Sequence, residues 1–217
     1  GEKDVHGSGS GDEADAAGLK HSLQQIGRST QRATHTVNQL LALARAEGGA
    51  AALSRQPCDL VQLTTQVIQD SLPRALDKRI DLGYEGAEPG SPGVMVQGNP
   101  LLIQEMIRNL VDNAINYTPS SPGQPGVVTA RVLTDPYGHA IVVQVEDSGP
   151  GIAASERDLV FQPFYRALGT EADGSGLGLP IVREIAQQHG ASVTLDDARP
   201  GQPNPGALFS IRFSSLA

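Results

Sequence analysis

Hydrophobic positions between residues 19 and 47 recur at alternating intervals of four and three residues. They are Leu19, Leu23, Ile26, Thr30, Ala33, Val37, Leu40 and Ala44. This spacing is an a/d heptad stripe over roughly four repeats, and it predicts a long helix that packs against a partner helix. An amphipathic helix lying on its own domain is the simpler alternative. Gly48 and Gly49 follow the stripe and predict its end.

After residue 56 the pattern changes to segments of helical and strand period. Helices are predicted at about 60–72, 100–117 and 177–189, and strands at 80–84, 94–97, 127–133, 140–146, 193–195 and 208–213. Asp59 and Asn99 are predicted N-caps, and Pro100 suits the first position of the second helix. We therefore expect an α+β fold, a two-layer sandwich with helices on one face of a mostly antiparallel sheet.

The chain has 217 residues, which suits one domain of ordinary size with an appendage. We predict a tag remnant or flexible linker at residues 1–18, the heptad helix at 19–47, a linker at 48–56 and the folded domain at 57–217. Hydrophobic content is 39% and Trp is absent, so the core must rest on aliphatic residues.

The formal net charge of -8 argues against a general nucleic-acid binder, because such proteins are normally basic. Cys58 is the single cysteine and cannot form an internal disulfide, which makes a reducing compartment the default. No apolar run is long enough to cross a bilayer. We expect either a soluble protein or the soluble part of a longer membrane protein.

Three short blocks, at residues 109–114, 147–152 and 174–179, carry the candidate chemistry. In the first, Asn109 and Asn113 are four residues apart and share a helix face. A carboxamide oxygen there can ligate Mg²⁺ beside phosphate oxygens. The alternative is an ordinary polar helix face.

The second block places Asp147 at the end of an apolar strand, where its carboxylate can accept a hydrogen bond from an exocyclic amine such as that of adenine. Gly149 and Gly151 allow a sharp turn and a close approach to a flat ligand. An ordinary Asp-Ser-Gly turn is the alternative.

The third block is a glycine-rich segment that leads into a helix. The N–H groups around Gly174, Gly176 and Gly178, together with the helix N-terminus, suit a polyphosphate. A hinge without ligand contact is the alternative. The segment is not a Walker loop, because no Gly-Lys-Ser/Thr follows.

Together these blocks resemble, in order, the N, G1 and G2 boxes of bacterial two-component sensor histidine kinases. Residues 161–166 resemble the F box of that family. Residues 19–47, especially 38–45, resemble the second helix of its dimerisation and phosphotransfer hairpin. The chain is thus similar to the catalytic and ATP-binding domain of these kinases, which share a superfamily with DNA gyrase, Hsp90 chaperones and MutL. The resemblance implies a Bergerat-type ATP-binding fold.

The resemblance also implies ATP and Mg²⁺ as cofactors, with Asn113 as the metal ligand. Tyr117 would lie against the adenine and Asp147 would hold its amino group. Residues 153–175 would form a lid over ATP, which Phe161 and Phe164 would anchor by apolar packing. The implied ATP-binding residues are Asn109, Asn113, Tyr117, Asp147, Gly149, Gly151, Ile152, Phe164, Arg166, Gly174, Gly176, Leu177 and Gly178.

As partners the resemblance implies a response-regulator receiver domain and a second copy of the chain, paired through hairpin helices, with no nucleic acid. It places the chain in the cytoplasmic part of a bacterial inner-membrane sensor. The implied activity is transfer of the ATP γ-phosphoryl group to a histidine and then to a regulator aspartate. A nucleotide-binding pseudokinase acting as an interaction module, or a related ATPase, stays open as an alternative.

The sequence departs from the family pattern at Asn116, where many members carry Lys or Arg that would help hold the terminal phosphates. Arg108 or Arg166 could compensate. Asn109 stands where hydrolytic relatives have a Glu base, and a carboxamide is a poor general base, so hydrolysis should be slow.

The acceptor histidine of the family is a further departure, because none of the five histidines is followed by the acceptor segment. They are His6, His21, His35, His139 and His189. We therefore expect a piece of a longer protein that contains no catalytic acceptor residue and cannot autophosphorylate by the usual route.

Overall fold

The computed structural model describes Leu19 and residues 55–134, 140–165 and 176–214. The elements in chain order are β1 (Gln56–Asp59), α2 (Leu60–Asp77), β2 (Ile80–Gly86), β3 (Met95–Gly98), α3 (Pro100–Tyr117), β4 (Gly126–Thr134), β5 (Ala140–Asp147), α4 (Gly178–Gln188), β6 (Ser192–Asp197) and β7 (Ala207–Ser214). Two 3₁₀ turns, Ala154–Glu156 and Leu159–Phe161, lie between β5 and α4. Apart from Leu19, which is helical and exposed, the predicted heptad helix lies outside the described residues.

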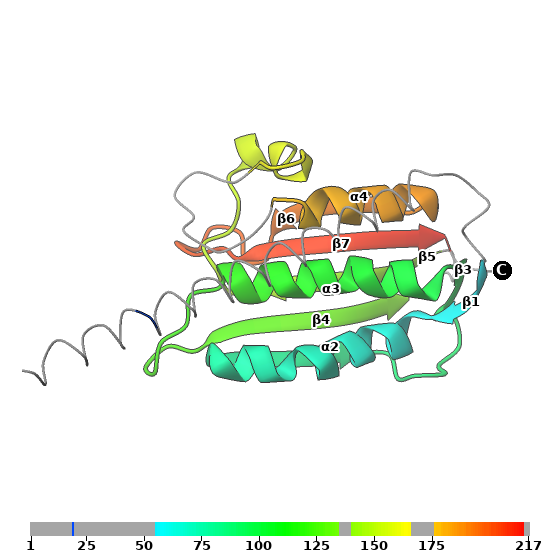
Figure 1. Ribbon diagram of the computed structural model, residues 1–217, viewed down its shortest axis with the longest axis horizontal. Helices are drawn as coiled ribbons and strands as arrows, with labels where there is room; N and C mark the ends of the chain where they lie inside the picture. The colour runs from blue at the N-terminus through cyan, green and yellow to red at the C-terminus, as the bar shows by residue number, and fades with distance from the viewer. Residues whose placement is uncertain (1–18, 20–54, 135–139, 166–175, 215–217) are drawn as a thin grey trace, which may run out of the picture. The chain divides into compact units, whose positions relative to one another are not determined.

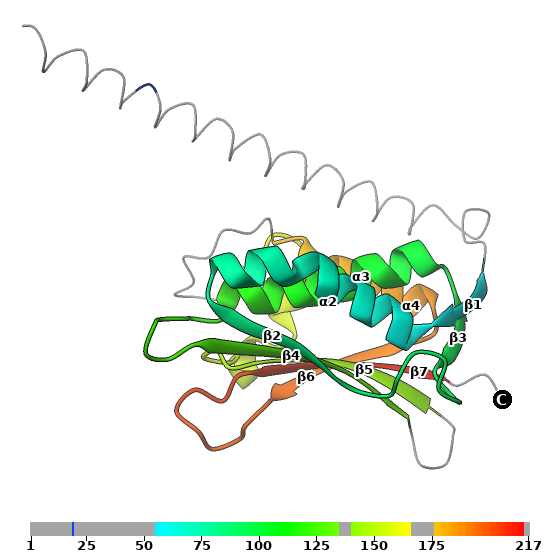
Figure 2. The same cartoon turned by 90° about the horizontal axis from the view of Figure 1, so that it is seen from below.

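Five strands form one sheet in the order β2-β4-β5-β7-β6. The β2–β4 pair is parallel and the other three pairs are antiparallel. Helices α2, α3 and α4 lie side by side on one face of this sheet (Figures 1 and 2). The predicted two-layer α+β architecture and mostly antiparallel sheet are therefore confirmed.

Alternation along the central strands decides which side chains meet the helices. In β5, Ile141, Val143 and Val145 are buried, and the side chains between them are half-buried. Asp147 continues the buried series at the end of the strand and is 8% exposed. Because side chains alternate with a period of two, its carboxylate points to the helix-covered face of the sheet.

Both predicted N-caps form. Asp59 Oδ1 accepts from the N–H groups of Val61 and Gln62 at 2.8 and 3.0 Å. Asn99 Oδ1 accepts from the N–H groups of Leu101 and Leu102 at 3.0 and 3.2 Å. Each cap satisfies N–H groups that have no partner within the helix.

One predicted helix boundary was wrong, and one strand was missed. Helix α2 passes through Pro73 and ends at Asp77 instead of at residue 72. A proline inside a helix costs about 3 kcal/mol, but the last turn buries Ala75 completely and ties Arg74 to α3. Strand β1 was not predicted, since its four residues contain only one buried position, Cys58.

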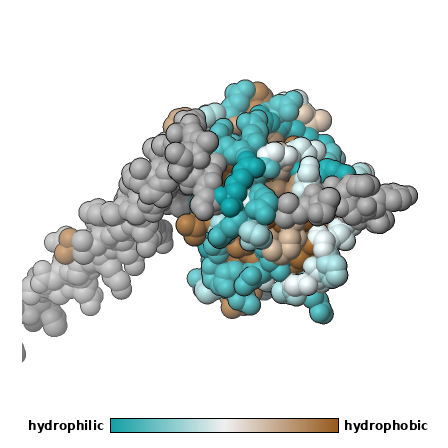
Figure 3. Space-filling model, turned by 90° about the vertical axis from the view of Figure 1, so that its right-hand side faces the viewer, coloured by the Kyte–Doolittle hydropathy of each residue, from teal (hydrophilic) through white to brown (hydrophobic). Residues whose placement is uncertain are grey.

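The surface mixes hydrophilic and hydrophobic residues where it is seen from the end of the domain that carries β1 and β3 (Figure 3). Within the described ranges, no helix combines the length and the apolarity needed to span a membrane.

His189 joins the end of α4 to the start of α3. Its Nε2 accepts from the N–H group of Asn99 at 3.0 Å, and its Nδ1 lies 2.7 Å from the carbonyl oxygen of Ile185. The imidazole is therefore neutral, with the proton on Nδ1. Burial lowers the pKa of His189 from its ordinary value of 6.5, the hydrogen bond to Ile185 opposes this, and the charge of Arg55 lowers it further.

We expect His189 to make the fold less stable in mild acid. Because its pKa is lower in the folded than in the unfolded chain, the unfolded chain binds more protons as pH falls below 6.5. The free energy of unfolding should therefore decrease through that range and flatten below the folded pKa. Urea unfolding from pH 7.5 to 5 should show a shallower dependence for His189→Gln than for the unmodified chain. Parallel curves would contradict the assignment, because the other four histidines are common to both proteins.

Candidate functional site

Asp147 is held in one orientation by backbone groups. Its Oδ1 accepts from the N–H groups of Gly149 at 2.8 Å and Ala207 at 3.2 Å. Both recorded hydrogen bonds use the same oxygen, which leaves Oδ2 as the acceptor for a ligand. Burial raises the pKa of this carboxyl group, while the two N–H groups and the charge of Arg199 oppose the increase. The result is a buried, oriented acceptor at the end of β5.

The three blocks identified in the sequence meet around α3. A Cβ atom on Gly149 would lie 2.9 Å from Asp147 Oδ1 and 3.1 Å from the carbonyl oxygen of Tyr117, at the end of α3. A Cβ atom on Gly178 would lie 3.1 Å from Asn109 Oδ1. Tyr117 and Asn109 are eight residues apart, or about 12 Å along the helix. The second block therefore meets the C-terminal end of α3, and the third block meets the helix about two turns earlier.

The two asparagines on α3 have different surroundings. The amide nitrogen of Asn109 donates to the carbonyl oxygen of Glu105 at 2.8 Å and to Glu105 Oε1 at 3.2 Å, which turns its Oδ1 toward Gly178. Asn113 is half-buried, and its side chain makes no hydrogen bond within the described part of the chain. Its carboxamide is thus available to a ligand or a hydrated cation.

The amino end of α4 differs from those of α2 and α3, because its N-cap residue is Leu177, whose side chain makes no capping hydrogen bond. Helix N-termini carry unpaired N–H groups and a partial positive charge, and so favour an anion. Here that end lies beside Asn109. The arrangement offers an acceptor for an amine near Tyr117 and donors for an anion near Gly178.

The segment between β5 and α4 is anchored by only one of its two predicted aromatic residues. Phe161 is 6% exposed, meets the Phe209 ring edge-on at 6.3 Å, and carries the Arg183 guanidinium 4.3 Å above its ring. Phe164 is 66% exposed, so its predicted apolar packing was wrong. Its N–H instead donates to the carbonyl oxygen of Gly176 at 2.9 Å, and its φ of 63° supports the tight turn there.

The remaining predicted residues fall into three groups. Gly151 has a φ of +77° and packs on Pro205, and Ile152 packs against the core. The Leu177 side chain is 1% exposed in the core, so the side chain itself is shielded from a ligand. Arg166 and Gly174 lie outside the described residues.

The loop before β7 contacts Asp147 and the turn after it, which no local sequence pattern predicts. Gly206 donates to the carbonyl oxygen of Gly149 at 3.0 Å, and a Cβ on Gly206 would lie 2.0 Å from the carbonyl oxygen of Asp147. Its φ of +69° favours glycine as well. The Gly and Pro residues at 201–206 predict a turn, but nothing local indicates that this turn contacts a residue about 60 positions earlier.

Comparison with known proteins identifies the class to which this fold and site belong. The family model described as "Histidine kinase-, DNA gyrase B-, and HSP90-like ATPase" matches residues 98–216. Sensor protein kinase PmrB of Pseudomonas aeruginosa is 37% identical over 181 residues, which cover 83% of this chain and 36% of PmrB. Sensor protein QseC of Escherichia coli O157:H7 is 34% identical over 191 residues, covering 86% of this chain and 39% of QseC.

Solved structures agree with this assignment. The mycobacterial sensor histidine kinase MprB has a TM-score of 0.59 at 32% identity, over 74% of this chain and 97% of that chain. Full-length ShkA in complex with AMPPNP has a TM-score of 0.72 at 26% identity, over 91% of this chain and 39% of ShkA.

The chain therefore belongs to the histidine kinase, gyrase and HSP90-like ATPase family. More particularly, it contains the ATP-binding catalytic domain of a bacterial two-component sensor histidine kinase. It spans little more than a third of the length of the curated relatives named above.

Gly206→Ala should destabilise the domain and weaken ATP binding together. The new Cβ meets the Asp147 carbonyl and has to displace it, which together with the positive φ should cost roughly 2–4 kcal/mol. Gly201→Ala is the matched control, because Gly201 also has positive φ but open space around its Cβ position; it should cost about 1 kcal/mol and leave ATP affinity unchanged. Urea unfolding and calorimetric titration measure both effects. Equal effects of the two substitutions would contradict the role of Gly206.

Proposed function

We propose that this domain binds Mg²⁺-ATP between α3, the turn after β5 and the amino end of α4, and donates the γ-phosphoryl group to a histidine. The observation that carries the proposal is the pairing of a buried, oriented carboxylate at the C-terminal end of α3 with the N-terminus of α4, which lies beside Asn109 about two turns earlier in α3. About 12 Å of helix separates these two places, which suits a molecule with a purine at one end and a polyphosphate at the other.

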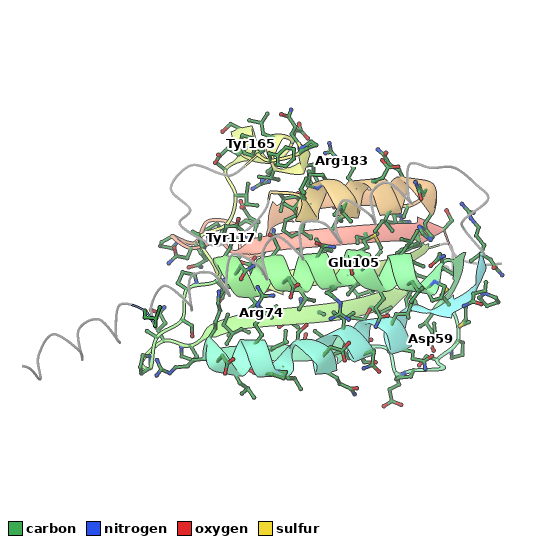
Figure 4. All side chains as sticks on the ribbon, viewed as in Figure 1. Asp59, Arg74, Glu105, Tyr117, Tyr165 and Arg183 are labelled. Atoms are coloured by element: carbon green, nitrogen blue, oxygen red, sulfur yellow. The ribbon has the colours of Figure 1, made fainter. Side chains whose placement is uncertain are left out.

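At the purine end, Asp147 accepts a hydrogen bond from the adenine 6-amino group through Oδ2. Gly149 and Gly151 have no side chains that would fill this turn, and Tyr117 lies at the same end of α3 (Figure 4). Ile152 adds apolar surface and Phe164, exposed beside Gly176, lies on the segment that borders the site. A base that carries an acceptor instead of the amino group would be disfavoured there.

At the phosphate end, N–H groups near Gly176, Leu177 and Gly178 receive phosphate oxygens, with Gly174 and Arg166 as further contacts. The free carboxamide of Asn113 suits Mg²⁺, which binds oxygen ligands and retains several waters; when bound, the ion neutralises charge on the phosphates. Asn109 lines the same face, and its Oδ1 is already oriented toward α4.

Phosphoryl transfer is favoured over hydrolysis because the polar face of α3 has no general base at position 109. Asn109 is neutral, and its amide is engaged by Glu105, so it cannot deprotonate a water molecule. Positioning and charge stabilisation then do the catalytic work, and the acceptor supplies its own nucleophile. We propose that the acceptor is a histidine on a hairpin helix, that a receiver domain takes the phosphoryl group onward, and that a second copy pairs through the hairpin in the cytoplasmic part of a membrane sensor.

Asp147→Asn should invert the choice of base. The Gly149 and Ala207 N–H groups fix the carbonyl oxygen of the new side chain, so its NH₂ group faces the purine and opposes the adenine amine. ATP affinity should fall at least tenfold, in line with loss of a charge-assisted hydrogen bond. Inosine triphosphate, which has an acceptor at position 6, should lose much less. An unchanged ratio of ATP to inosine triphosphate affinity would reject the proposed orientation.

Asn113→Ala should uncouple nucleotide binding from magnesium. In the unmodified chain, Mg²⁺ should tighten ATP binding; in the variant, affinity without Mg²⁺ should stay the same and the Mg²⁺-dependent gain should disappear. Phosphoryl transfer to a separately supplied acceptor hairpin should be lost as well, as with a hairpin whose acceptor His is replaced by Gln. ATP binding by the unmodified chain without transfer to the hairpin would indicate a nucleotide-binding pseudokinase, and rapid phosphate release without a hairpin would indicate an ATPase.

A further inference from the structure

Two cationic side chains at the C-terminal end of helix α2, Arg74 and Lys78, contact residues of α3 close to Asn113 in the sequence. Arg74 Nη1 donates to Asp112 Oδ1 at 2.7 Å, and Arg74 Nη2 donates to Asn116 Oδ1 at 2.6 Å. Lys78 Nζ also donates to Asn116 Oδ1, at 3.3 Å. Figure 4 shows Arg74 between the two helices. The neutral Asn116 amide orients both cations and cancels neither charge.

This cluster borders the helix face that carries the two candidate asparagines. Asn116 lies seven residues after Asn109 and three after Asn113, which places it within about 20° and 60° of them around the helix. Asp112 and Asn116 flank Asn113 in the sequence, one before it and the other less than a turn after it. Asp112 lies about 100° and Asn116 about 60° from Asn113 around the helix, so the guanidinium that bridges them is held on the α2 side of Asn113.

The contacts also leave the guanidinium able to bind an anion. It has five N–H donors in a planar fork that suits phosphate oxygens, and its recorded hydrogen bonds go only to Asp112 and Asn116. The Arg74 side chain is 43% exposed. As a surface ion pair alone it would contribute little to stability.

A second ion pair between the same helices lacks this geometry. Arg108 Nη2 pairs with Asp70 Oδ2 at 2.9 Å, on the α2 side of α3. It lies five residues before Asn113, or about 140° away around the helix. Arg108 is therefore poorly placed to supply a charge beside Asn113, which makes it a matched comparison for Arg74.

We propose that Arg74, held by Asp112 and Asn116, is a phosphate-binding residue of the nucleotide site, contributed by α2. The inference rests on the proposed function and adds a cation to it. Phosphate oxygens next to Asn113 receive N–H groups from the Arg74 fork, and Asn116 positions that fork from α3.

Calorimetric titration of the full chain with ATP, ADP and adenosine, in the presence of Mg²⁺, tests the inference. Arg74→Gln keeps an N–H donor and removes the charge. ATP affinity should fall about tenfold, the size expected for a lost charge-assisted hydrogen bond. ADP should lose less, and adenosine affinity should not change. Arg108→Gln, which breaks the other ion pair, should leave all three affinities unchanged.

A purely structural role for Arg74 gives different results. Equal losses for ATP and adenosine, an unchanged ATP affinity in Arg74→Gln, or the same loss in Arg108→Gln would each overturn the inference. Failure of the unmodified chain to bind ATP would overturn the proposed function as well, so the two failures are distinguishable.

Asp112→Asn is a second variant that does not depend on the folding of Arg74→Gln. It removes the carboxylate that competes with phosphate for the guanidinium, and should tighten ATP binding by about threefold while adenosine binding stays the same. If Arg74 only joins the helices, Asp112→Asn breaks that ion pair and gives no gain in ATP affinity, which would overturn the inference.

Discussion

The burial of one carboxylate at the end of β5 is the constraint on which the rest of the site depends. An ionised group away from water needs hydrogen bonds, and Asp147 receives them from the backbone of the turn that follows it and from the start of β7. These two hydrogen bonds fix the turn and tie the start of β7 to the end of β5. Glycine is required at 206 because the carbonyl oxygen of Asp147 occupies the space that a side chain would need. The same bonds leave one oxygen directed to a ligand. Stability and recognition thus share a single buried group.

Helix α3 connects that carboxylate to the other half of the site. One end touches the glycine turn after β5, and a point about two turns earlier touches the first residue of α4. Its buried face, which includes Met106 and Leu110, packs on the sheet. This packing fixes the position of its polar face relative to the sheet. The N-cap residues of α2 and α3 cap their helices with side-chain oxygens, whereas Leu177 at the start of α4 makes no such bond. A helix N-terminus carries a partial positive charge and therefore favours an anion.

Asn109 gives the domain its chemical character within a family that includes both kinases and ATPases. A carboxamide engaged by Glu105 offers no base for water, whereas the rest of the face is suited to position phosphates and a cation. The same helix carries Asn116 in place of a cation, and the structure brings Arg74 to that position from α2. The positive charge that α3 lacks at Asn116 is thus present on Arg74 of α2. Arg74 can reach Asn116 because α2 and α3 lie side by side.

Local pattern was enough to determine the secondary structure, the capping residues, the two-layer arrangement and the three blocks of the site, since each depends on residues within a few positions of one another. The sequence also predicted that Asp147 lies at the end of the apolar strand, and the structure places its side chain on the buried face. Other features required the tertiary structure. Helix α2 continues past Pro73 because its last turn packs on α3, and β1 exists only through pairing with β3. Gly206 meets Asp147, and Arg74 meets Asp112 and Asn116, through contacts with residues about 60 and 40 positions away in the sequence. No local pattern encodes such contacts, because they arise only when the sheet and helices bring distant segments together.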